Sequence, residues 1–183
     1  MASLPDPVQS GLTPEQKALY DELCSTRGRI DGMYRSLLNH PDLLARVAAL
    51  GTFFRFGESA LPDAARELAI LRTAASLEAG YEWVKHVPPA QKAGLPGAVI
   101  EAVRQKKRPD GLSPELSAVY DATERVLAFK SLPKDLQEAL EKAYGVKGVL
   151  ELVALCGFYR MIAGVIFAFD VPLPPGERDP FHS

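Results

Sequence analysis

Residues 64–94 read AARELAILRTAASLEAGYEWVKHVPPAQKAG and predict two helical segments that meet near Gly80. In the first segment, Glu67 lies on a stripe of otherwise apolar residues at helical spacing, which is an unusual place for a carboxylate. In the second segment, Glu82 and His86 are four residues apart and therefore share one face of the helix. If the two segments pack against each other as a hairpin, Glu67 joins this pair.

The cluster predicted by this hairpin has the chemistry of a proton-transfer site. Two carboxylates and one imidazole lie in apolar surroundings, where burial raises the pKa of a carboxyl group and a neighbouring charge counters the shift. Aromatic residues occur beside this cluster and in the segment before it: Tyr81, Trp83, Phe53, Phe54 and Phe56. Such aromatic residues usually belong to a core, and the alternative is that the three phenylalanines form one wall of a substrate pocket beside Glu67.

The spacing of these residues resembles the core motif of the carboxymuconolactone decarboxylase and AhpD-like superfamily. The resemblance is carried by Glu67, the eleven residues after it, then Ala79, Glu82 and His86, together with the phrase YEWVKH. It implies an all-α fold, an AhpD-like helical bundle around an antiparallel helical hairpin, with Glu67 and His86 at proton-relay positions. In the thiol-peroxidase branch the motif contains a CxxC pair, whose positions fall here on Ala79 and Glu82, so the chain resembles the branch that lacks this pair.

Length and composition favour a single soluble domain. The chain has 183 residues, of which 47% are hydrophobic, enough for a sizeable core. Its formal net charge is −2, so nucleic acid is not expected as a partner. Cys24 and Cys156 lie far apart inside helical patterns, which predicts free thiols in a reducing compartment, and the sequence assigns them no further role. The N-terminus has no signal-peptide pattern, so we expect a cytoplasmic protein.

The pattern along the chain is helical throughout. We expect an N-terminal tail over residues 1–12, one all-α domain over residues 13–170 and a C-terminal arm over residues 171–183. Within the domain, residues 13–56 form N-terminal helices and residues 61–170 form the core. No segment alternates apolar and polar residues as a half-buried strand does.

The C-terminal part of the core is predicted as two helices, one that ends at Gly145 and one over residues 149–169. The second is apolar enough to raise the question of a membrane span, but Arg160 near its middle would cost about 2.5–3.5 kcal/mol in a bilayer, so we expect no membrane partner. This arginine needs a carboxylate partner or binds an anionic substrate. One face of the helix carries small residues and the other carries large ones, and both faces require packing.

The leading hypothesis is a cofactor-free enzyme that moves protons on a small carboxylate, lactone or carbonyl compound, a decarboxylase or isomerase of the carboxymuconolactone decarboxylase kind. His86 is the principal acid and base, Glu82 orients or charges it, and Glu67 completes the relay. The residues predicted to contact the small-molecule substrate are Tyr81, Trp83, Phe53, Phe54 and Arg160.

Two other functions remain open on the sequence alone. A thiol peroxidase is disfavoured because the CxxC pair is missing, and a non-catalytic oligomer that binds a small molecule is the other alternative. A metal site at Glu67, Glu82 and His86 is not expected, because a single imidazole makes a thin ligand set. The resemblance implies homo-oligomers, trimers or hexamers, and we expect the proline-rich arms to become ordered by wrapping a neighbouring subunit.

Overall fold

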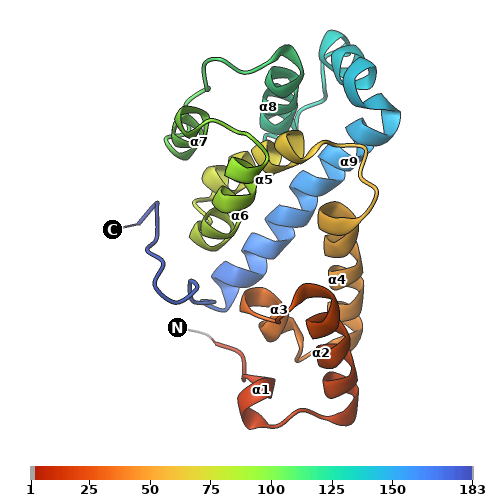
Figure 1. Cartoon of the computed structure of the whole chain (residues 1–183), viewed down its shortest axis with the longest axis vertical. Helices are drawn as coiled ribbons and strands as arrows, with labels where there is room; N and C mark the ends of the chain where they lie inside the picture. The colour runs from red at the N-terminus through yellow and green to blue at the C-terminus, as the bar shows by residue number, and fades with distance from the viewer. Residues whose placement is uncertain (1–2, 183) are drawn as a thin grey trace.

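The computed structural model describes residues 3–182, apart from the side chain of Arg27. Met1, Ala2 and Ser183, the outermost residues of the predicted tail and arm, lie outside the described residues. The elements are α1 (Pro7–Ser10), α2 (Pro14–Arg27), α3 (Gly32–Leu37), α4 (Pro41–Phe56), α5 (Asp63–Leu77), α6 (Gly80–Lys92), α7 (Gly97–Arg104), α8 (Pro114–Leu127) and α9 (Lys134–Ala168) (Figure 1). No strand occurs in residues 3–182, and the all-α prediction is confirmed.

Helix α5 is the centre of the fold, because it packs against α6, α7, α8 and α9 and its residues 67–75 are all buried. The helix ends at Leu77, where Glu78 adopts a left-handed conformation with a φ of 54°. The backbone N–H of Glu78 caps the last turn, and α6 begins at Gly80. This tight connection folds α6 back along α5, and the predicted helical hairpin is confirmed (Figure 1).

The N-terminal helices begin as the sequence predicts. Thr13 accepts a hydrogen bond from the backbone N–H of Gln16, and the Gln16 side chain accepts one from the backbone N–H of Thr13. This capping box, with Pro14 at the first helical position, fixes the start of α2. Residues 28–31 form a loop between α2 and α3.

Helix α9 replaces the two predicted C-terminal helices. Its helical run continues from Lys134 to Ala168 and is interrupted at Gly145, whose φ of 68° and ψ of 172° are not helical. The predicted break is therefore present, but as a kink instead of a connection. By length and composition, α9 is the one helix of the described chain that could cross a membrane, and here it packs against α5 and α8.

The predicted N-terminal tail is partly helical and binds its own chain. Asp6 caps α1 by accepting a hydrogen bond from the backbone N–H of Val8, and it also pairs with the guanidinium of Arg35. Asn39 donates a side-chain hydrogen bond to the carbonyl of Pro5 at 2.9 Å. The sequence analysis expected this segment to need a neighbouring subunit, whereas α3 and the turn after it supply the contacts.

The C-terminal arm also packs on its own chain, against α6 and α7. The ring of Phe181 meets that of Trp83 edge-on, with centroids 5.3 Å apart, and Arg104 donates a hydrogen bond to the carbonyl of Pro180. The Asp179 carboxyl lies over Gly80, so closely that a Cβ there would be 2.9 Å from it. A residue without a side chain at the start of α6 therefore makes room for the arm.

The arm gives a simple prediction about fluorescence, because Trp83 is the single tryptophan of the chain. Replacing Phe181 with alanine should expose the indole to water and shift its emission to longer wavelength. Phe129→Ala, a change at an aromatic side chain that is 84% exposed, serves as the control and should leave the emission unchanged. If the emission of Phe181→Ala equals that of the wild type, the arm does not cover Trp83 in solution.

Candidate active site

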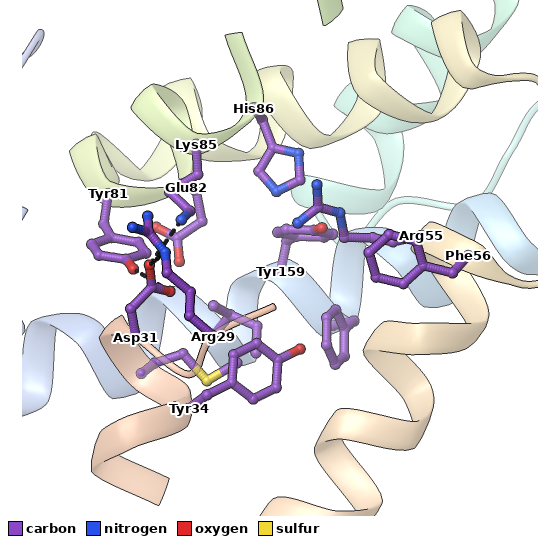
Figure 2. A pocket seen from close by; sticks show the side chains of 13 residues that line it. Arg29, Asp31, Tyr34, Arg55, Phe56, Tyr81, Glu82, Lys85, His86 and Tyr159 are labelled. Atoms are coloured by element: carbon purple, nitrogen blue, oxygen red, sulfur yellow. Dashed lines mark hydrogen bonds and ion pairs between the residues drawn. The ribbon is translucent and has the colours of Figure 1, made fainter. Parts of the chain in front are cut away.

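The hairpin brings Glu67 of α5 and His86 of α6 together in the interior. Nδ1 of His86 lies 2.7 Å from Oε2 of Glu67, and the two residues are 4% and 2% exposed. Because a carboxylate only accepts hydrogen bonds, we assign the imidazole proton to Nδ1, which donates to Glu67. Nε2 then keeps its lone pair, and Figure 2 shows the ring directed from α6 into the cavity. The structure thus gives the orienting role to Glu67, whereas the sequence analysis had assigned it to Glu82.

The environment of His86 favours its neutral form. Burial lowers the pKa of His86, while the hydrogen bond and negative charge of Glu67 raise it, and the positive charges of Arg55 and Lys85 lower it further. The net direction is downward from the ordinary value of 6.5. A neutral imidazole with a free Nε2 is a base that is ready to accept a proton.

Glu82 stands one turn before His86 on α6 and lies apart from the Glu67–His86 pair. The residue is 3% exposed, and neither of its carboxyl oxygens has a hydrogen-bond partner among the described residues. Burial raises the pKa of Glu82 to about 8. The nearby backbone N–H of the same residue lowers the pKa, but by less than burial raises it. Glu82 is therefore mainly protonated at neutral pH, and no described side chain or backbone group forms a hydrogen bond with its carboxyl group.

Glu82 and His86 open onto a cavity of about 160 Å³. The side chains that line it are Arg29, Asp31, Met33, Tyr34, Arg55, Phe56, Tyr81, Glu82, Lys85, His86, Phe158, Tyr159 and Ile162 (Figure 2). Five of these thirteen side chains are phenylalanine or tyrosine, and the ring of Tyr159 meets the His86 ring edge-on at 5.0 Å. Burial raises the pKa values of Tyr81 and Tyr159, so their hydroxyl groups stay protonated. A site with these walls suits a small molecule.

An ion-pair network around Asp31 closes one side of the cavity. Oδ2 of Asp31 lies 2.9 Å from Nε of Arg29 and 3.1 Å from Nζ of Lys85, and Oδ1 accepts a hydrogen bond of 3.3 Å from the hydroxyl group of Tyr81. Arg29 and Asp31 belong to the loop between α2 and α3, whereas Tyr81 and Lys85 belong to α6 (Figure 2). The network therefore fixes the N-terminal loop to the hairpin.

The predicted aromatic contacts are only partly correct. Tyr81 lines the cavity, but Trp83 faces Phe181 of the arm. Phe54 is buried behind Phe158, with ring centroids 5.5 Å apart, and Phe53 lies on the outside of α4, so neither lines the cavity. Neighbouring residues of a helix point in different directions, and from this aromatic run it is Phe56 that reaches the cavity.

Within the described part of its own chain, Arg160 contacts neither a carboxylate nor the cavity. Its Nη1 atom donates a hydrogen bond of 2.9 Å to the carbonyl of Leu127, the last residue of α8. Its guanidinium lies 4.6 Å from the centre of the Phe129 ring. Arg160 therefore satisfies a carbonyl at the end of a helix, which has no partner within that helix, and takes no part in the cavity.

Comparison with known proteins agrees with this arrangement. Residues 41–125 match the model of the carboxymuconolactone decarboxylase family. This part of the chain is similar to that family. The matched segment contains Glu67, Glu82 and His86, and the resemblance proposed from the sequence is confirmed. No curated protein matches the chain in sequence.

Solved structures show where else this carboxymuconolactone decarboxylase fold occurs. A peroxidase-related protein from Ralstonia eutropha with an alkylhydroperoxidase AhpD core has a TM-score of 0.78 at 18% identity, covering 95% of this chain and 93% of that one. A peroxidase-related protein from Silicibacter has a TM-score of 0.75 at 16% identity, covering 95% and 92%. The debrominase Bmp8 bound to 2,3,4-tribromopyrrole has a TM-score of 0.71 at 13% identity, covering 98% and 93%. At these identities the likeness shows the fold alone.

Proposed function

We propose that this chain is a cofactor-free proton-transfer enzyme, a decarboxylase or isomerase that acts on a small carboxylate, lactone or carbonyl compound. One observation carries the proposal: a buried imidazole, held by Glu67 at 2.7 Å, turns its free Nε2 toward a cavity that also contains the unpartnered acid Glu82. Base and acid are thus available in one small cavity at neutral pH.

In an isomerisation, Nε2 of His86 removes a proton from the carbon next to a carbonyl group. Glu67 accepts the hydrogen bond from Nδ1 and stabilises the imidazolium that forms. Glu82 donates a hydrogen bond, or its proton, to the carbonyl oxygen as negative charge develops there. In a decarboxylation, Glu82 gives its proton to the enolate oxygen left by the loss of CO₂. Nε2 of His86 then takes this proton from the enol and delivers it to carbon, and Glu82 recovers a proton from water.

The positions of the cysteines support this choice over a thiol peroxidase. Cys156 is 1% exposed, and burial raises the pKa of its thiol to about 11, although contacts with Thr73 and Thr123 lower it. A reactive thiol needs the opposite environment, with a low pKa and access to its substrate. Neither Cys156 nor Cys24 lines the cavity beside His86.

The proposed function is tested by solvent-deuterium exchange. Small keto acids, unsaturated acids and lactones are incubated with the protein in D₂O and a chelator, and proton NMR follows the loss of carbon-bound hydrogen and any release of CO₂. Binding is checked separately by thermal shift, because a ligand at 100 times its dissociation constant adds about 2.7 kcal/mol of stability. Compounds that bind without exchange or turnover would favour the alternative, a non-catalytic small-molecule-binding protein.

We also propose that the protein is a cytoplasmic homo-oligomer, a trimer or hexamer. Two helices carry exposed apolar side chains, which we propose pack against a second copy of the chain. They are Leu150, Val153, Met161 and Phe167 on α9, and Leu43, Leu50 and Phe53 on α4. Apolar side chains gathered on one surface favour burial against another chain. The free cysteines support a reducing compartment.

Light scattering should therefore give a mass of three or six times 19.9 kDa at micromolar concentration. Met161→Glu, which places a charge on the exposed face of α9, should lower that mass by dissociating the assembly. The matched control is Lys134→Glu at the start of the same helix, where the native side chain is 90% exposed. A wild-type mass of 19.9 kDa would show that these faces are satisfied within one chain.

A further inference from the structure

The cavity is lined by three cationic side chains, Arg29, Lys85 and Arg55, and they differ in what they bind. Arg29 and Lys85 both pair with Oδ2 of Asp31, at 2.9 and 3.1 Å. Asp31 therefore balances one of these two positive charges, and its contacts hold both side chains in position. Arg55 takes no part in this network.

Arg55 lies in the last turn of α4, and no carboxylate of the described residues is within ion-pair distance of it. Its guanidinium carbon lies 5.5 Å from the centre of the Phe56 ring, a contact that holds the group in place without using its N–H donors. Figure 2 shows the guanidinium near Tyr159, on the side of His86 away from Glu82. A fork of donors beside the base is therefore available to a ligand.

We propose that Arg55 binds the anionic group of the substrate and thereby decides which end of the molecule faces Glu82. This inference rests on the proposed function, since it concerns the same cavity, and it names a residue that determines specificity. A guanidinium recognises a carboxylate through two parallel hydrogen bonds, which fixes the orientation of the ligand as well as its charge. Glu82 does not oppose this binding, because it is mainly neutral at pH 7.

The placement of the groups determines how the ligand lies. In Figure 2, His86 stands between Arg55 on one side and Glu82 on the other. A carboxylate held by Arg55 leaves the rest of the molecule beneath Nε2 of His86, with its far end toward the acid Glu82. The aromatic walls made by Phe56, Phe158 and Tyr159 suit a flat body. The cavity therefore fits a planar monocarboxylate whose reactive carbon lies between its anionic end and a carbonyl oxygen.

The test is a binding measurement by calorimetry on the full chain, with two probes of nearly equal size, the anion benzoate and the neutral amide benzamide. The wild type should bind benzoate at least about tenfold more tightly than benzamide, since only benzoate offers a charged partner to the fork. Arg55→Gln should remove this preference. The matched control is Arg46→Gln, a change on the same helix at a 75% exposed side chain that pairs with Asp42, and it should keep the preference.

Arg55→Lys keeps the charge and loses the fork, so it should bind benzoate several-fold more weakly than the wild type. Arg55→Lys also replaces Arg55→Gln as the test variant if circular dichroism shows that Arg55→Gln does not fold. Equal affinity of the wild type for the two probes, no benzoate binding at tens of millimolar, or an unchanged preference in both Arg55 variants would each overturn the inference. Because the test measures binding alone, the preference for benzoate can hold even if the deuterium-exchange test fails, so the two proposals fail separately.

Discussion

Replacing His86 with glutamine should slow solvent-deuterium exchange into the substrate by roughly 10²–10⁴-fold, the usual contribution of a positioned acid or base. Glutamine is polar and of similar length, so the buried position stays filled, but its amide cannot accept a proton at neutral pH. The exchange rate is measured by proton NMR in D₂O with the substrate that the panel identifies. Binding should change much less than the rate, because the ring is proposed to act on the proton and not to anchor the ligand.

A companion variant separates the base from the residue that orients it. Glu67→Gln leaves His86 in place and replaces the charged acceptor at 2.7 Å with a neutral amide. The amide oxygen can still accept from Nδ1–H but stabilises the imidazolium less, so the variant should cause a smaller loss of rate than His86→Gln. The control is His182→Gln in the C-terminal arm, where the side chain is 57% exposed and lies outside the cavity. Full exchange activity in a folded His86→Gln protein would remove His86 from the mechanism.

The second large effect concerns stability and pH at Glu82. Burial raises the pKa of Glu82 from 4.5 to about 8, so the folded state holds this proton over a range in which the unfolded chain has lost it. The folded state binds more protons between these values, and stability therefore falls as pH rises from about 4.5 and levels off above about 8. At about 1.36 kcal/mol for each unit, the full loss is on the order of 5 kcal/mol.

Glu82→Gln, which is neutral at every pH, should remove this loss. The free energy of unfolding of the variant, measured with urea across this range, should match or fall below that of the wild type at pH 4.5 and exceed it by a few kcal/mol near pH 8. Both proteins keep His86, so its titration cancels in the difference. The control is Glu138→Gln at an exposed side chain, and its free energy of unfolding should follow the same pH dependence as that of the wild type. If Glu82→Gln also followed the wild-type pH dependence, the Glu82 carboxyl would be ionised in the folded state.

The hairpin, and with it the grouping of Glu67 with Glu82 and His86, could be predicted from the sequence because the grouping depends on helical spacing. Residues on one helical stripe share a face, and the short connection at Glu78 leaves few ways to pack two such helices. The same spacing could not show that Glu67, rather than Glu82, holds the imidazole, since i,i+4 geometry allowed either partner. That choice depends on how α6 is rotated against α5, which only the packing reveals.

The remaining cavity residues are brought together by tertiary contacts. Asp31 and Arg55 come from the N-terminal helices and the loop between them, where no motif marks them, and the contact between Asp31 and Lys85 spans 54 positions. The partner of Arg160 within its own chain also depends on a tertiary contact. An arginine in an apolar helix needs a partner, but a free carbonyl at the end of a neighbouring helix meets that need as well as a carboxylate does.

The central claim is that His86 is a neutral base whose Nε2 faces the cavity, and NMR of protein labelled with ¹⁵N at histidine tests it most directly. The nitrogen shifts distinguish imidazolium, the Nδ1–H tautomer and the Nε2–H tautomer. We predict the neutral Nδ1–H form for His86 at pH 6.5, the ordinary midpoint of histidine, with the free Nε2 signal responding when a cavity ligand is added. An imidazolium at that pH, or a proton on Nε2 that no ligand disturbs, would contradict the account.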